Sequence, residues 1–324
     1  MHKKILIYNS GGGLGDTIQQ FPLLLSLKNH FVGFKFFYLG AHENHLKNKL
    51  KEYNLDLETV DLNLKYFGFR WWHLFKVKQK LKEQNINKFD LIIDLQSKLR
   101  NTLVLKQMPH DTFFSPTFNF VFCTKKNKDF SYKKKKDLTI LENLEFFINE
   151  KIKRTNFSLD MLDQKFIKES ARLLPDNNYI GFSVTQGNKY RKKTWPIESF
   201  IKLAQECLNK GKKLVFFVEK SEIDLVSAIN REIPEAFFPE HESKISCPAL
   251  ITALASRLEG AVSIDNGVMH MMNLANIPMI VLFGPTDSNK FAPKRKNVHV
   301  LDSKKLYSSK DISEITVSDV LKFL

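Results

Sequence analysis

The stretch SIDNGVMHMMNLANIPMIVLFGPTD, Ser263 to Asp287, decides the fold class. An apolar run ends in Asp265 and an Asn–Gly turn, a helical segment with apolar residues follows, and a second apolar run ends in a Gly–Pro turn. Short apolar runs that alternate with helical segments are typical of buried parallel strands in α/β proteins. The stretch therefore predicts a strand–helix–strand unit whose two strand ends share one edge of a parallel sheet, the edge at which such folds bind ligands.

The same alternation runs through the rest of the chain. Strands are predicted at 4–8, 33–40, 91–95, 178–185, 212–219 and 260–265, and helices at Thr17–Lys28, Glu43–Glu52, Leu138–Ile148 (with Glu145 facing outward), Ile197–Asn209, Ser221–Glu232, Cys247–Arg257 and from about Thr316. The segment after Lys151 shows no obvious strand, which is where we place a boundary. We predict an α/β protein with two Rossmann-like, doubly wound domains, residues 1–165 and 166–324.

Length and charge agree with two globular domains and suggest a polyanionic partner. The chain has 324 residues, of which 43% are hydrophobic, and a net charge of +15. Nucleic acid, anionic lipid headgroups or a phosphorylated sugar would each match this charge, although a lysine-rich composition alone also explains it. No nucleic-acid-binding motif is present in the sequence, so we expect no nucleic-acid partner.

Cysteine usage and hydropathy favour a cytoplasmic location. Cys123, Cys207 and Cys247 are scattered, without the spacing of a zinc site, and are predicted to be free thiols. No stretch approaches the roughly 20 apolar residues that span a bilayer, and the apolar run at the N-terminus is too short for a signal peptide.

The glycine-rich loop NSGGGLGDTIQQF (9–21) follows the first predicted strand. The dinucleotide fingerprint GxGxxG would need a third glycine after Gly13 and Gly15, and an acid after the second strand, and both are missing. Asp16 at the helix start would also repel a pyrophosphate. NAD binding is therefore disfavoured, and Asp16 has two interpretations, a helix N-cap or a catalytic base.

Two loops in the second half are suited to a diphosphate. Thr185 ends a strand, and Lys193 precedes the Trp–Pro that opens a helix. The turn at Asn266–Gly267 exposes helix N–H groups that attract anions, with His270 one turn further on, where a buried structural histidine is the alternative. The chain has no Asp-x-Asp pair, so we expect no metal and no other cofactor.

Four stretches together resemble a known family. They are GGGLGDTIQQFPLLLSLK (11–28), FDLIIDLQSKLRN (89–101), KKTWPIESFIKLA (192–204) and DNGVMHMMNLANIPMIVLFGPTD (265–287). Their order and motifs resemble the family 9 glycosyltransferases, which include the bacterial lipopolysaccharide heptosyltransferases. Asn266 stands where the family has Ser or Thr, and LVFFVEKSE (214–222) lacks the family's glycine before the acid.

The resemblance implies a GT-B fold, in which an N-terminal acceptor domain and a C-terminal nucleotide-sugar domain face a cleft, and a terminal helix (about 312–324) packs back on the first domain. It implies inverting, metal-independent transfer of a sugar, heptose from ADP-heptose in the heptosyltransferases. Asp16 matches the general base, and Lys193 acts with it at the catalytic centre. The donor residues that the resemblance implies are Thr185, Lys193, Glu222, Asp265, Asn266, Gly267 and His270.

The acceptor side is expected to bind an anionic glycolipid at the cytoplasmic face of the inner membrane. Implied acceptor residues are Gly13, Gly15, Arg70, Lys98 and Arg100. The basic run within 124–137 is either a membrane contact or a solvated loop. Trp71 and Trp72 have three interpretations, an acceptor loop, a membrane-facing pair or core packing. A nucleotide-sugar or glycolipid binding protein without catalysis is the alternative function.

Overall fold

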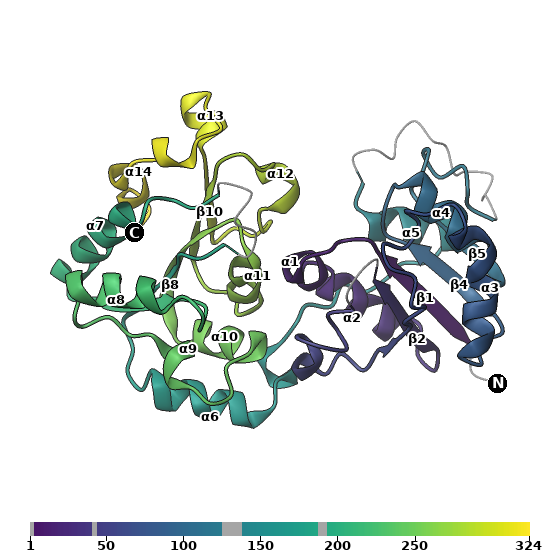
Figure 1. Cartoon of the computed structure of the whole chain (residues 1–324), viewed down its shortest axis with the longest axis horizontal. Helices are drawn as coiled ribbons and strands as arrows, with labels where there is room; N and C mark the ends of the chain where they lie inside the picture. Colours follow the sequence, from purple (N-terminus) through teal and green to yellow (C-terminus); the bar gives the residue numbers. More distant parts are fainter. Residues whose placement is uncertain (1–2, 41–43, 125–137, 187–192) are drawn as a thin grey trace. The chain divides into compact units, whose positions relative to one another are not determined.

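A computed structural model describes residues 3–40, 44–124, 138–186 and 193–324. The chain divides into two compact units, Met1–Phe157 and Ser158–Leu324. Each unit contains a five-stranded parallel sheet with helices on both sides (Figure 1). The predicted fold class, two doubly wound α/β domains, is confirmed.

The N-terminal unit has the strand order β3-β2-β1-β4-β5. The order reverses between β1 and β4, which makes this gap the topological switch point, where ligands bind in open α/β sheets. The strands are β1 (Lys4–Asn9), β2 (Lys35–Gly40), β3 (Glu58–Thr59), β4 (Phe89–Asp94) and β5 (His110–Phe114), and the helices are α1 (Leu14–Ile18), α2 (Phe21–His30), α3 (His73–Glu83), α4 (Leu99–Lys106) and α5 (Ile140–Ile148).

Alternate residues of this sheet face two hydrophobic layers. Leu6 and Phe113 pack in one core with Val77 of α3 and with residues of α4. The next residue on β5, Phe114, contacts Phe147 of α5 with ring centroids 5.4 Å apart. The near-continuous apolar strands are therefore explained by burial on both faces.

The C-terminal unit has the strand order β10-β9-β8-β6-β7, with its switch point between β6 and β8. Its elements are α6 (Gln164–Leu173), β6 (Tyr179–Ser183), α7 (Ile197–Asn209), β7 (Lys213–Phe217), α8 (Ile223–Glu232), α9 (Pro239–Glu242), α10 (Pro248–Ala255), β8 (Leu258–Ile264), α11 (Gly267–Leu274), β9 (Met279–Phe283), α12 (Ser288–Phe291), β10 (Val298–Asp302), α13 (Ser303–Tyr307) and α14 (Val317–Leu321).

The end of the chain is anchored within this unit. Trp195, which is buried, donates from its indole Nε1 to the carbonyl of Ile315 at 2.7 Å. Val320 of α14 belongs to the same core as Phe200 of α7. Gly284 permits this packing, because a Cβ there would lie 2.8 Å from the Cβ of Ile312. The contact predicted between the terminal helix and the N-terminal domain stays a prediction.

Two predicted helices of the N-terminal unit are wrong in detail. The helix expected at Thr17–Lys28 is interrupted after Ile18, and α2 starts at Phe21 with Pro22 in its first turn, where the missing N–H costs nothing. Within Glu43–Glu52, the described residues from 44 onward form turns that lead into a 3-10 helix at Lys51–Tyr53. The backbone hydrogen bonds there have i→i+3 spacing apart from one i→i+5 bond, so no α-helix propagates.

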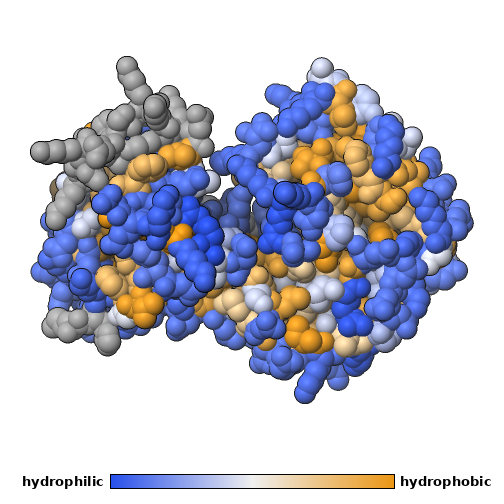
Figure 2. Space-filling view, turned by 180° about the vertical axis from the view of Figure 1, so that it is seen from behind, coloured by the Kyte–Doolittle hydropathy of each residue, from blue (hydrophilic) through white to orange (hydrophobic). Residues whose placement is uncertain are grey.

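Most of the surface visible in Figure 2 is hydrophilic, with smaller apolar patches on both units. Among the described residues, no helix is both long enough and apolar enough to cross a membrane. The three cysteines are free, as predicted.

Candidate functional site

The carboxyl ends of β1 and β4 are joined at the switch point of the N-terminal unit. The amide oxygen of Asn9, the last residue of β1, accepts from the backbone N–H of Gly11 and from Nε2 of Gln96, both at 2.9 Å. Neither Asn9 nor Gln96 was assigned a role from sequence. Their position in the sequence could have identified them, since each is a polar residue directly after an apolar strand run.

Asp16 lies at the third position of α1, so Gly13 and not Asp16 is the N-cap residue. The backbone N–H of Gly13 donates to Oδ2 of Asp16 at 3.1 Å. Among the described residues, no hydrogen bond reaches the other carboxylate oxygen, Oδ1, and the side chain is half-buried. The loop passes so close to this residue that only glycine fits at position 11, since a Cβ on Gly11 would lie 2.4 Å from the Cβ of Asp16. One oxygen therefore fixes the loop and the other remains available to a ligand.

A buried carboxylate organises the end of β4. Asp94 is fully buried, and its Oδ2 accepts from the hydroxyls of Thr102 and Ser115, both at 2.7 Å. Its Oδ1 accepts from the backbone N–H of Gln96 at 2.9 Å. Burial raises the pKa of Asp94 to about 6, although these three hydrogen bonds act in the opposite direction. The network ties β4 and β5 to the start of α4.

The predicted acceptor residues lie at this end of α4 and in the turn before α3. Lys98 is the N-cap residue of α4, its carbonyl accepts from the Thr102 hydroxyl at 3.2 Å, and its side chain is exposed. The guanidinium groups of Arg70 and Arg100 both lie over the ring of Phe69, at 5.9 Å and 4.7 Å from its centroid. The structure therefore brings Arg70 and Arg100 together although they are distant in sequence, and it shows that Trp71 and Trp72 are exposed rather than in the core.

The C-terminal unit places a lysine against an aspartate at its switch point. Nζ of Lys193 lies 2.5 Å from Oδ2 of Asp265, and the two side chains are only 15% and 9% exposed. Asp265 directly follows β8, and Lys193 precedes α7, so the pair connects the loops after β6 and β8. An ammonium group has three N–H donors, so Lys193 can hold Asp265 and still donate to a phosphate oxygen.

Asn266 joins the same two loops. Its Nδ2 donates to the hydroxyl of Ser183 and to the carbonyl of Thr185, both at 2.7 Å. Its Oδ1 caps α11 by accepting from the N–H of Met269 at 2.8 Å. The cap leaves the N–H groups of Gly267 and Val268 to meet an anion at the helix N-terminus.

The remaining predicted donor residues lie near these strand ends. Thr185 is half-buried two residues after β6, and His270 is buried in α11. Glu222 is the half-buried N-cap residue of α8, which follows β7. Sequence reasoning missed Glu240 of α9, whose buried carboxyl has its pKa raised to about 7 by burial and by the nearby charge of Glu219.

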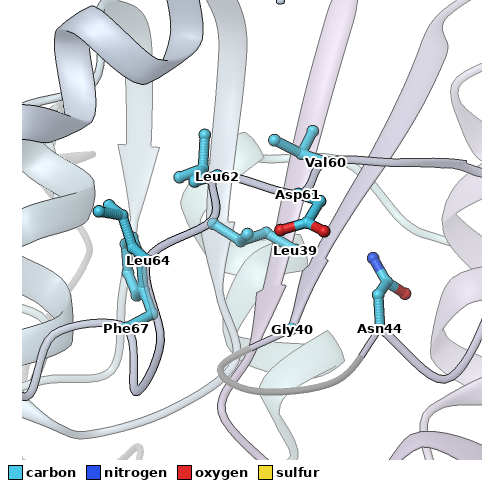
Figure 3. Close-up of a pocket in the computed structure, with 8 residues that line it drawn as sticks. All are labelled: Leu39, Gly40, Asn44, Val60, Asp61, Leu62, Leu64 and Phe67. Atoms are coloured by element: carbon cyan, nitrogen blue, oxygen red, sulfur yellow. The ribbon is translucent and has the colours of Figure 1, made fainter.

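A small cavity of about 30 Å³ lies beside β2 and β3 and does not involve the predicted residues (Figure 3). Asn44 and Asp61 are the polar side chains in its wall, and the other residues that line it are Leu39, Gly40, Val60, Leu62, Leu64 and Phe67. Its volume is that of about one water molecule, which excludes a sugar or a nucleotide.

Comparison with known proteins decides the family. The sequence profile of glycosyltransferase family 9 (heptosyltransferase) matches residues 74–320. The chain belongs to glycosyltransferase family 9. A lipooligosaccharide heptosyltransferase 2 from Haemophilus influenzae is 28% identical over 134 residues, a match that covers 40% of this chain and 37% of that relative's length.

Solved structures of family 9 members share the fold over almost the whole chain. A family 9 glycosyltransferase from Veillonella parvula has a TM-score of 0.66 and 19% identity, covering 99% of this chain and 95% of that one. The E. coli heptosyltransferase WaaC with ADP-2-deoxy-2-fluoro heptose has a TM-score of 0.65 and 15% identity, covering 99% and 98%. At these identities the likeness shows the fold alone.

Parts of the family 9 motifs of this chain lie at strand ends beside the two switch points. The Gly-x-Gly-Asp loop and the segment 94–96 share that of the N-terminal unit, and Lys193 and the segment 265–267 share that of the C-terminal unit. Within the described residues, no cluster of three His, Cys, Asp or Glu side chains is placed to bind a metal ion. The basic run at 125–137 lies outside the described residues.

Proposed function

We propose that this chain transfers heptose from ADP-heptose to a lipopolysaccharide core acceptor, with inversion and without a metal ion. The observation that carries the proposal is the pairing of Lys193 with Asp265 beside the uncapped N–H groups of α11. The ammonium group of Lys193 and these N–H groups offer hydrogen-bond donors to a departing nucleoside diphosphate without a divalent cation. The family and the names of the heptosyltransferases to which the chain is similar support the choice of sugar and acceptor.

The proposed reaction assigns the base role to Asp16. Its Oδ1 accepts the proton of the acceptor hydroxyl while the hydroxyl oxygen bonds to the anomeric carbon. The bond from that carbon to the β-phosphate oxygen breaks, and ADP leaves with the bonding electrons. Oδ2 stays on the N–H of Gly13, so the carboxylate keeps its orientation during proton transfer.

The diphosphate is held by the C-terminal unit in this proposal. Lys193 donates to a phosphate oxygen, and the N–H groups of Gly267 and Val268 point at the same charge. Glu222 and Thr185 are assigned to the donor as well. Gly13, Gly15, Arg70, Lys98 and Arg100 are assigned to the anionic acceptor.

The test is release of ADP from ADP-heptose in the presence of a lipopolysaccharide acceptor that lacks heptose. We expect ADP release that depends on the acceptor and persists in EDTA. Binding of ADP-heptose without ADP release would instead support the non-catalytic alternative, and activity that EDTA removes and Mg²⁺ restores would contradict the metal-free scheme.

A further inference from the structure

Five large aromatic residues are exposed together around the start of α3. They form an aromatic cluster, which comprises Tyr66, Phe69, Trp71, Trp72 and Phe75. Trp71 is 70% exposed and Phe75 72% exposed. The rings contact one another, since Trp71 lies 6.1 Å from Trp72 and 5.9 Å from Phe75, both edge-to-face. A contiguous exposed patch of large apolar side chains indicates an interaction site, whereas single exposed apolar residues do not.

The helix that carries this cluster is amphipathic and basic. His73, Val77 and Leu81 recur at i, i+4 and i+8 and are buried, whereas Phe75, Lys76 and Lys78 of α3 are exposed. Residues 65–83 include six lysines and arginines and one acidic residue, Glu83, which forms an ion pair with Lys80 at 2.7 Å. The aromatic cluster is therefore surrounded by positive charge, to which Arg100 of α4 adds through its contact with Phe69.

We infer that the aromatic cluster and the basic face of α3 dock this protein on an anionic lipid bilayer. Tryptophan and other aromatic rings prefer the boundary between headgroups and acyl chains, and lysines beside them are attracted to anionic lipid. This inference does not depend on catalysis. Under the proposed function, docking would also bring Lys98, the N-cap residue of α4, to the headgroups of a glycolipid.

Two other occupants fit the observations less well. A second copy of the chain on this face would bring two basic surfaces together in a protein whose net charge is +15. Single-stranded nucleic acid would stack its bases on open ring faces. Here guanidinium groups already lie over Phe69 and Trp72, with Arg70 at 5.3 Å from the Trp72 ring, and Trp71 and Phe75 meet edge to face.

The test is sedimentation of the full chain with vesicles of phosphatidylcholine, alone or mixed with phosphatidylglycerol. We expect binding only to the anionic vesicles. Trp71→Ser with Phe75→Ser should weaken it on the order of tenfold, because two exposed aromatic anchors are lost. Lys76→Glu with Lys78→Glu should weaken it by a similar factor.

Matched controls separate this surface from general charge. Lys47→Glu with Lys49→Glu makes the same charge change at exposed positions elsewhere in the unit, and Val32→Ser removes an exposed apolar side chain. Both should bind as the parent does. Unchanged binding of the two test variants, equal loss in the controls, or a parent dimer that the aromatic variant dissociates would overturn the inference. The sedimentation assay measures vesicle binding and involves no sugar transfer. A negative result would therefore overturn this inference without bearing on the proposed function.

Discussion

The switch points of the two units both lie beside the unit's first strand, β1 or β6, but they differ in the groups that they offer a ligand. In the N-terminal unit the strand ends carry two carboxylates, Asp16 in the glycine loop and Asp94 beneath it. In the C-terminal unit they carry Lys193, which forms an ion pair with Asp265, and the N–H groups of Gly267 and Val268 at the N-terminus of α11. A glycine-rich loop after the first strand is therefore not sufficient for phosphate binding, because Asp16 gives it the wrong charge. Under the proposed function, the strand ends at a switch point serve as a proton acceptor in one unit and as an anion site in the other.

Replacement of Asp16 tests the N-terminal switch point, and we expect it to have the largest effect. Asp16→Asn should lower kcat by about 10²–10⁴-fold, because the amide cannot take a proton. The amide oxygen can still accept from Gly13, so the thermal unfolding temperature should stay close to that of the parent. Steady-state ADP release measures the first effect and calorimetry the second. Full activity in this variant would remove Asp16 from the mechanism.

Replacement of Lys193 tests the basic side. Lys193→Met should lower kcat by about 10²–10³-fold, because the leaving diphosphate loses one charged donor. Lys193→Arg keeps the charge and should retain more activity than the methionine variant. Titration with ADP measures the affinity for the diphosphate separately from kcat. If the methionine variant bound ADP more weakly but kept its kcat at saturating donor, Lys193 would contribute to ground-state binding only.

Sequence patterns predicted four of the five strands and most helices of the C-terminal unit because apolar runs and turn residues there coincide. The fifth strand, β10, is partly exposed and was missed. Helix α7 starts and ends at its predicted residues, Ile197 and Asn209. In the N-terminal unit, α3 was missed because lysines mask its pattern, although the buried residues His73, Val77 and Leu81 have helical spacing. The i, i+4 spacing was therefore available in the sequence.

Contacts between distant residues were not predictable. Glu145 was expected to face outward, since a carboxylate in a helix normally faces solvent. It is buried and accepts from Nη1 of Arg154 at 2.8 Å and from the N–H of Ile152 at 2.7 Å. The side chain of Arg154 lowers the pKa of this carboxyl. Two further contacts likewise depend on chain crossings that no local pattern contains. They are the bond from Ser115, which follows β5, to Asp94 and the meeting of Arg70 with Arg100.

The buried carboxyl of Asp94 should make the free energy of unfolding depend on pH. Burial raises the pKa of Asp94 from 3.8 to about 6, so the folded state binds its proton more tightly than the unfolded state does. This contribution is fully present below pH 3.8 and is lost as the pH rises through about 6. Relative to Asp94→Asn, the parent should lose about 1–3 kcal/mol of unfolding free energy across that window. Urea unfolding of both proteins at a series of pH values measures the difference, and a pH-independent difference would contradict the raised pKa.

Asn266 offers the smallest and most specific test, because it reverses the chain's departure from the family motif. Asn266→Ser keeps an oxygen that can cap α11 but removes the donor shared by Ser183 and Thr185. A single hydroxyl proton cannot replace both bonds, so the unfolding free energy should fall by about 1 kcal/mol. Asn266→Ala, which also removes the cap, should cost about 1 kcal/mol more. If the serine variant were as stable as the parent, the two bonds from Nδ2 would not hold the loops after β6 and β8 together, and the choice of asparagine at this position would need another explanation.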